Sequence, residues 1–154
     1  MDLKNFILDV DGVLTNGQFY YSDQGKVFKK FGPHDADGLK AINKYLSIRF
    51  ISADKRGFGI TKKRIEDMGF DVVLVAEETR SSWVESNYNF ENLVFMGDGL
   101  YDVPVLKKSK FSIAPNNAVS EAKLSADFTT NADGGNGAVY EACMHLIKLI
   151  DEPV

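Results

Sequence analysis

Acidic and hydroxyl side chains follow three short apolar segments of the chain. Asp9 and Asp11 lie in FILDVDG, Ser52 lies in RFISAD, and Asp98 and Asp102 lie in LVFMGDGLYD. When parallel strands end at one edge of an α/β sheet, the groups that follow them share a crevice beyond their carboxyl ends. The sequence therefore predicts three or four carboxylates and a hydroxyl in one site.

A cluster of carboxylates indicates a ligand, because carboxylates repel one another and ionise poorly without a cation. Mg²⁺ is a hard cation that prefers one or two carboxylates, water and the oxygens of a substrate phosphate. A lone DxD pair is more typical of a turn with solvated acids. Here GDxxxD follows a second apolar segment, with a hydroxyl-ended segment between them. The combined pattern predicts a magnesium site that receives a phosphate.

The strands expected to position these groups are five short apolar runs bounded by polar or glycine residues. They cover residues 6–8, 48–51, 72–75, 93–96 and 111–113. Continuous rather than alternating apolarity is typical of strands that are covered on both faces of a parallel sheet. Segments with helical character lie between them, at 39–46, 60–68, 81–88 and 138–150. This alternation predicts an α/β fold with a doubly wound, mostly parallel sheet.

Residues 17–31 break the alternation. Aromatic residues and valine flank the segment Ser22-Asp23-Gln24-Gly25, which predicts a β-hairpin with a glycine-containing turn, inserted after the first strand. The aromatic side chains offer more apolar surface than a monomer ordinarily exposes. They are Phe19, Tyr20, Tyr21, Phe28 and Phe31. We expect the hairpin to pack on another subunit, with packing back on its own sheet as the alternative.

Composition narrows the class of protein. A typical domain has about 150 residues, and this chain has 154, so we expect a single domain over 1–154. Hydrophobic residues make up 44% and charged residues 26%, which is typical of a globular protein and excludes disorder and low complexity. The net charge of −4 argues against a nucleic-acid partner, which favours a basic surface.

The cysteine content and the apolar runs bear on location. Cys143 is the only cysteine, so no internal disulfide can form, and a reducing cytoplasm is the expected location. The first residues, MDLKNFILDVDG, are polar at the start and contain acids, unlike a signal peptide. No apolar run approaches the roughly 18 residues of a transmembrane helix, so we expect no membrane partner.

These motifs together resemble the haloacid dehalogenase superfamily of phosphotransferases. DVDGVLTNG, the segment ending at Ser52, and GDGLYD carry the resemblance. More narrowly, DVDGVLTNG with the hairpin, FGPHDADGLK, GDGLYDVPVL and GGNGAVYEA are similar to the branch of 3-deoxy-D-manno-octulosonate 8-phosphate phosphatases. That branch also holds nonulosonate 9-phosphate phosphatases and a domain attached to some cytidylyltransferases. The resemblance extends from Phe6 to about Ile147 and implies the Rossmann-like fold of the superfamily.

For the first acidic pair, the resemblance implies catalytic roles. Asp9 matches the nucleophile that forms a phosphoaspartyl intermediate. Asp11 matches the general acid and base, which protonates the leaving sugar oxygen and then activates water. The implied ligands of Mg²⁺ are Asp9, the backbone carbonyl of Asp11, and Asp98. An acid two residues after the nucleophile suits phosphoryl transfer with a leaving alkoxide, whereas a dehalogenase needs only the nucleophile.

The remaining matches imply binding roles around that pair. Ser52 matches the hydroxyl that holds the phosphoryl oxygens, with help from the backbone N–H of Ala53. Asp102 matches a supporting acid that orients the metal ligands. Arg80 stands where the family carries a lysine, and it presents a planar fork rather than a point charge. Lys55, in the loop SADKRG, is the other candidate for the phosphate-binding cation.

Four further positions differ from the family pattern. Ala53-Asp54 replaces the usual Gly-Arg, Gly99 replaces an acid, and Tyr140 replaces an arginine. These positions surround the substrate rather than the nucleophile and the metal. The differences therefore bear on substrate identity more than on reaction class.

The resulting prediction is a Mg²⁺-dependent phosphatase without a cap domain, acting on a small sugar-acid phosphate such as octulosonate 8-phosphate. The intervals from Asp9 to Ser52 and from Ser52 to Arg80 are too short to hold a cap. Without a cap, the site stays open to water unless a neighbour covers it. The resembled branch forms tetramers in which the hairpin helps to close the neighbouring site, so we expect a homotetramer.

Other functions fit parts of the pattern. One is a nonulosonate (sialic-acid-type) 9-phosphate phosphatase. Another is a weakly active or non-catalytic tetramerisation module, as in the cytidylyltransferases, which Arg80 and the altered loop favour but the full acid set does not. A phospho-acceptor receiver domain ranks last. Receivers place the acceptor aspartate after the third strand, where this chain has Val75-Ala76-Glu77.

Overall fold

The computed structural model describes residues 1–152, and a six-stranded parallel sheet forms its centre. The strand order is β5-β4-β1-β6-β7-β8, and every neighbouring pair is parallel. The strands are β1 (Asn5–Asp9), β4 (Ser47–Ser52), β5 (Val72–Leu74), β6 (Leu93–Met96), β7 (Phe111–Ala114) and β8 (Phe128–Thr129). The predicted doubly wound sheet is confirmed. Sequence analysis missed β8, which is too short to carry a hydrophobic pattern.

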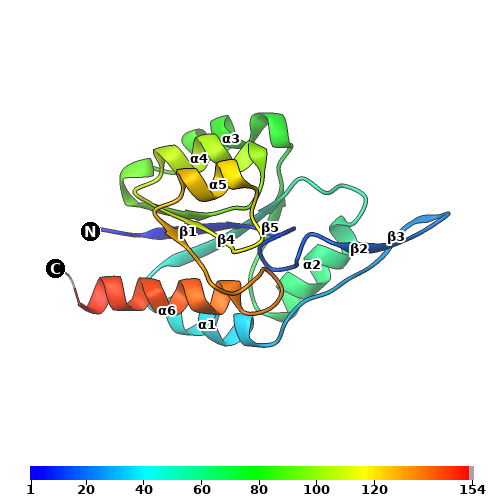
Figure 1. Cartoon of the computed structure of the whole chain (residues 1–154), viewed down its shortest axis with the longest axis horizontal. Coiled ribbons are helices and arrows are strands. Elements are labelled where there is room, and N and C mark those ends of the chain that lie inside the picture. The colour runs from blue at the N-terminus through cyan, green and yellow to red at the C-terminus, as the bar shows by residue number, and fades with distance from the viewer. Residues whose placement is uncertain (153–154) are drawn as a thin grey trace.

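Helices cover both faces of the sheet (Figure 1). One face carries α1 (His34–Ile42), α2 (Phe58–Asp67) and α6 (Ala138–Asp151). The other carries α3 (Arg80–Asn87), α4 (Val103–Lys108) and α5 (Ser120–Ser125). Short 3₁₀ turns, η1 (Glu77–Thr79), η2 (Phe90–Asn92) and η3 (Leu100–Asp102), precede α3, β6 and α4. Both faces of the strands are therefore buried, as their continuous apolarity predicts.

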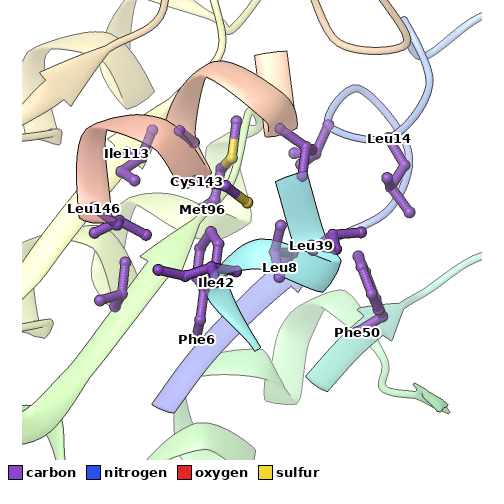
Figure 2. Close-up of a cluster of buried hydrophobic side chains, with 14 of the residues drawn as sticks. Phe6, Leu8, Leu14, Leu39, Ile42, Phe50, Met96, Ile113, Cys143 and Leu146 are labelled. Carbon is purple, nitrogen blue, oxygen red and sulfur yellow. The ribbon is translucent and has the colours of Figure 1, made fainter. Parts of the chain in front are cut away.

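The alternation of side chains along β1 supplies two separate cores. Phe6 and Leu8 point to the core beneath α1 and α6, whereas Ile7 points to the core beneath α3 and α4. Figure 2 shows Phe6 and Leu8 beneath Leu39 and Ile42 of α1. All of these side chains are fully buried. A strand fixed on both faces holds the residue at its end, the first predicted acid, in a rigid position.

The order of the strands reverses next to β1, and this reversal locates the crevice. From β1 the chain builds β4 and β5 on one side and then returns to build β6, β7 and β8 on the other. In the register of these strands, Leu8 lies opposite Met96 and Asp9 lies opposite Ile51. Ligands of open α/β sheets bind beyond the carboxyl ends of the strands at such a switch point.

The predicted hairpin is present as β2 (Phe19–Ser22) and β3 (Gly25–Lys29), which form a two-stranded antiparallel sheet of their own. It extends beyond the carboxyl ends of the main strands (Figure 1). Tyr20 and Phe28 are 71% and 65% exposed. Within residues 1–152, no helix combines the length and the apolar character needed to cross a membrane. Packing of the hairpin on another subunit stays a prediction.

Candidate active site

A cavity of about 430 Å³ opens at the carboxyl ends of β1, β4 and β6. The four predicted acids all line it, together with Ala53 and Arg80. The hairpin adds Phe19 and Lys26, and the segment after β6 adds Leu100 and Tyr101. The structure thus brings together groups from segments far apart in the sequence, at the edge that the strand endings predict.

Three carboxylates form a tight cluster inside this cavity. Asp9 is the last residue of β1 and is 6% exposed, and Asp98 and Asp102 follow β6. One carboxylate oxygen from each of the three lies within 4.8 Å of the others. The backbone N–H of Val10 donates to Oδ1 of Asp9 at 2.8 Å. The cluster therefore joins the two strands that flank the switch point.

Burial and mutual repulsion make this cluster costly to ionise. Burial, followed by the charge of Asp102, raises the pKa of Asp9 well above its usual range. The same two causes raise the pKa of Asp98 to about 6. A divalent cation would offset the repulsion between these carboxylates. The donor set, made of carboxylate oxygens alone, fits a hard cation such as Mg²⁺.

Asp102 is held by the protein itself. Its Oδ2 accepts hydrogen bonds from the backbone N–H groups of Asp98 at 2.9 Å and Gly99 at 3.1 Å. Its Oδ1 accepts a hydrogen bond from Nη1 of Arg80 at 2.6 Å. Both oxygens of this fully buried side chain thus already have donors. Asp102 is placed to fix the loop that carries Asp98, which leaves Asp9 and Asp98 to offer oxygens to a cation.

Arg80 supplies the positive charge of the cluster. It begins α3, and its Nη1 lies 3.5 Å from Oδ2 of Asp9. Burial alone would lower the pKa of Arg80, but the charges of Asp9 and Asp102 outweigh burial and raise it. The guanidinium is therefore charged and lies beside the predicted nucleophile, on the helix where the resembled family carries a lysine.

The loop after β1 passes close to Asp98. Gly12 has φ +85°, and a Cβ at this position would overlap the Asp98 carboxylate. The hydroxyl of Thr15 accepts hydrogen bonds from the N–H groups of Gly12 at 3.2 Å and Gly17 at 3.1 Å. Glycine at position 12 is thus required both by its backbone conformation and by the close approach of the Asp98 carboxylate.

Asp11 lies in the same loop but faces the hairpin. Its Oδ1 accepts from Nζ of Lys29 at 2.9 Å, and its carboxylate is not a member of the three-acid cluster. Sequence analysis missed Lys29. No pattern in the sequence distinguishes it from Lys30, its exposed neighbour. The fold makes the difference, because only Lys29 turns inward at the base of the hairpin.

The expected phosphate-binding groups are divided between two places. Ser52 ends β4 and is fully buried. Its hydroxyl accepts a hydrogen bond from the backbone N–H of Asp54 at 3.2 Å. The next residue, Ala53, lines the cavity. Lys55 is exposed and lines a separate hollow beside Glu77. The structure therefore does not bring Lys55 to the acid cluster, because the chain turns outward after Asp54.

Comparison with known proteins agrees with this geometry. Residues 81–142 match the family model described as haloacid dehalogenase-like hydrolase. The 3-deoxy-D-manno-octulosonate 8-phosphate phosphatase KdsC of Escherichia coli strain K12 is 30% identical over 148 residues, covering 92% of this chain and 78% of that protein. The KdsC of Haemophilus influenzae is 28% identical over 145 residues, covering 91% of this chain and 80% of that protein.

Solved structures give the same result. The Moraxella catarrhalis 3-deoxy-D-manno-octulosonate 8-phosphate phosphatase, in complex with magnesium, phosphate and KDO, has a TM-score of 0.84 and 25% identity, covering 96% of this chain and 87% of that one. The cobalt-bound phosphatase YrbI of Haemophilus influenzae has a TM-score of 0.81 and 27% identity, covering 96% and 88%.

Fold, site and comparisons therefore converge. The comparisons confirm the predicted superfamily and the prediction of a phosphatase. The switch-point acids lie together at the edge of the sheet where the resemblance expects them. The chain belongs to the haloacid dehalogenase-like hydrolases, in the branch of the 3-deoxy-D-manno-octulosonate 8-phosphate phosphatases.

Proposed function

We propose that this protein is a Mg²⁺-dependent phosphatase that hydrolyses a small phosphorylated sugar acid through a phosphoaspartyl intermediate. The observation that carries the proposal is the cluster of Asp9, Asp98 and Asp102 oxygens within 4.8 Å at the strand-order switch point. Its three carboxylates face a single guanidinium, that of Arg80. Such an excess of negative charge is suited to holding a hard divalent cation together with a phosphate.

In the first step, an Asp9 carboxylate oxygen attacks phosphorus and the bond from phosphorus to the sugar oxygen breaks. Asp11 gives its proton to the departing sugar oxygen. In the second step, Asp11 takes a proton from water, and the resulting hydroxide attacks phosphorus and displaces the Asp9 carboxylate. The products are the free sugar acid and inorganic phosphate. Asp9 and Asp11 both line the cavity, so both can reach one substrate.

The remaining site residues stabilise charge and orient the phosphoryl group. Asp9 and Asp98 would hold Mg²⁺, with the backbone carbonyl of Asp11, and the ion would neutralise charge on the phosphoryl oxygens when bound. Arg80 lies against Asp9 and adds fixed positive charge beside the reacting phosphorus. The Ser52 hydroxyl and the Ala53 N–H are the proposed donors to the phosphoryl oxygens.

The leading substrate class is a 2-keto-3-deoxy sugar phosphate such as 3-deoxy-D-manno-octulosonate 8-phosphate. The relatives named for this substrate support the proposal, as does a cavity of about 430 Å³, which suits a small sugar phosphate. The altered residues 53–54 adjoin this cavity, so a nonulosonate 9-phosphate belongs in the same substrate test. The proposed location is the cytoplasm, in keeping with a single, buried cysteine.

The proposal includes a homotetramer. Neither interval between the site segments holds a separate cap domain in residues 1–152, because the hairpin and α1 fill the first and α2 and β5 fill the second. The exposed Tyr20 and Phe28 offer an apolar surface on the hairpin for a neighbouring subunit. Light scattering on the unmodified protein and on Tyr20→Ser/Phe28→Ser tests it. A fully active monomer would refute it.

The test of the reaction is phosphate release with and without Mg²⁺. The panel contains 3-deoxy-D-manno-octulosonate 8-phosphate, a nonulosonate 9-phosphate, glucose 6-phosphate and p-nitrophenyl phosphate. We expect turnover that chelation of Mg²⁺ abolishes, fastest on one of the two sugar acids. No Mg²⁺-dependent release from any member would contradict the proposal and favour a non-catalytic assembly module.

A further inference from the structure

Lys29 is a buried cation with three close oxygen neighbours. Its side chain is fully buried at the base of the hairpin. Its Nζ lies 2.9 Å from Oδ1 of Asp11, 2.7 Å from Oδ2 of Asp54 and 2.9 Å from the hydroxyl of Thr61. The ammonium group donates a hydrogen bond to Thr61 and forms ion pairs with both carboxylates. Its position between Asp11 and Asp54 is therefore fixed by three oxygen neighbours.

The other end of this network is equally fixed. Oδ1 of Asp54 accepts from the backbone N–H of Gly57 at 3.1 Å, and Lys26 pairs with its Oδ2 at 2.8 Å. A Cβ at Gly57 would overlap Oδ2 of Asp54 and lie 2.8 Å from Cε of Lys29. The network is thus packed against backbone on one side and against α2, through Thr61, on the other.

Like Lys26 and Asp54, Asp11 reaches the cavity from this network. Its side chain is 32% exposed and lines the cavity, whereas Lys29 is inaccessible to solvent. Within residues 1–152, the hydrogen bonds and ion pairs of Asp11 leave its Oδ2 without a protein donor. The two oxygens of one carboxylate are therefore unequal, because one is bound to the ammonium group and the other is free.

We propose that Lys29 is a positioning residue for the acid–base step, which holds Oδ1 of Asp11 so that Oδ2 carries and transfers the proton. This inference rests on the proposed function of Asp11. An ammonium group beside Oδ1 disfavours a proton there, because its positive charge favours the anionic or carbonyl oxygen as its partner over the hydroxyl oxygen of the protonated acid. The proton that passes to the leaving sugar oxygen therefore travels on Oδ2. Lys29 touches no substrate and acts through Asp11 alone.

A selective loss of activity distinguishes this role from a structural one. An alkyl phosphate needs proton donation to its leaving oxygen, whereas the p-nitrophenolate of p-nitrophenyl phosphate leaves without it. For both substrates, kcat/KM reports the steps up to departure of the leaving group. A general acid contributes about 10²- to 10⁴-fold to such a step. Loss of its positioning should therefore lower kcat/KM for the alkyl substrate alone.

The experiment compares Lys29→Met with Lys30→Met, the same chemical change at an exposed neighbour. The substrates are p-nitrophenyl phosphate and the sugar phosphate that the unmodified protein hydrolyses fastest. In Lys29→Met we expect kcat/KM for the sugar phosphate to fall about 10- to 100-fold and that for p-nitrophenyl phosphate to change less than about threefold. Lys30→Met should match the unmodified protein on both substrates.

Circular dichroism and thermal unfolding confirm that each variant is folded. If Lys29→Met does not fold, Lys29→Arg carries the test, because it keeps the charge between Asp11 and Asp54 but spreads its donors over a planar fork. Equal losses on both substrates, or no loss, would overturn the positioning role. An unmodified protein without Mg²⁺-dependent activity would instead overturn the proposed function, and this role with it.

Discussion

Two groups of charged residues meet at the same cavity and differ in their balance of charge. In the first, which we term the open cluster, Asp9, Asp98 and Asp102 share one cation, Arg80. In the second, which we term the closed network, Asp11 and Asp54 are paired with Lys26 and Lys29. The open cluster has more carboxylates than cations, whereas the closed network has equal numbers.

The pKa values record this difference. Burial and the charge of Asp102 raise the pKa of Asp98 to about 6. Burial also acts to raise the pKa of Asp54, but hydrogen bonds from Lys26 and Lys29 outweigh it and lower that pKa to about 2. Carboxylates in one cavity can therefore be destabilised or stabilised as anions, according to their partners. The open cluster is built to receive a cation, and the closed network to hold a geometry.

The largest expected effect comes from the nucleophile of the open cluster. Asp9→Asn keeps the shape of the side chain but removes the anionic oxygen, so turnover should fall by about 10⁴-fold or more. Steady-state phosphate release measures the loss. Asp37→Asn, the same change at an exposed position of α1, serves as the control and should leave turnover unchanged. An Asp9→Asn variant with the unmodified rate would remove Asp9 from the reaction.

The same substitution in the two groups should have opposite effects on stability. Without metal at pH 7.5, Asp98→Asn relieves repulsion and should raise the free energy of unfolding, whereas Asp54→Asn weakens the pairing of Lys26 and Lys29 and should lower it. Each change should be about 1–3 kcal/mol. Urea unfolding in the presence of a chelator measures both. A loss of stability in both variants would break the distinction between the groups.

A smaller effect should appear in the pH dependence of the metal-free protein. The folded state binds a proton at Asp98 more tightly than the unfolded chain does, so this residue lowers stability as pH rises from about 4 to about 6. For Asp54 the folded pKa is the lower one, so its contribution is lost as pH falls from about 4 to about 2.

Thermal unfolding of the two Asn variants across this range measures the two slopes, each expected to amount to a few degrees. Asp98→Asn should remove the change in melting temperature between about pH 4 and pH 6. Asp54→Asn should remove the change between about pH 2 and pH 4. Curves parallel to that of the unmodified protein would show that these two carboxylates do not set the difference between the open cluster and the closed network.

The open cluster could be predicted from the sequence because its chemistry follows the strand ends. Asp9 ends a continuous apolar run, and Asp98 and Asp102 follow another, so strand order alone brings them together. Arg80 was predicted from the family resemblance instead, and the structure places it at the start of α3 beside the acids. The fold could be predicted from the same pattern, because the apolar runs indicate the strands and their ends indicate the edge of the sheet.

The closed network could not be predicted because its partners share no local pattern. Lys29 comes from the hairpin, Asp54 from the loop after β4 and Thr61 from α2, and only the tertiary packing of these elements brings them together. Sequence analysis named Lys55, in the loop after β4, as the alternative to Arg80 for the phosphate-binding cation. The loop turns that side chain outward and leaves the inward place to the hairpin.

The most direct test of the central claim is a calorimetric titration of the metal-free protein with Mg²⁺ at pH 7.5. We expect one binding site in the unmodified protein, lost or weakened at least about tenfold in Asp98→Asn. Asp54→Asn should retain that site, because Asp54 belongs to the closed network, whose carboxylates are already paired with Lys26 and Lys29. Absence of Mg²⁺ binding to the unmodified protein, or equal affinity in Asp98→Asn, would contradict the claim.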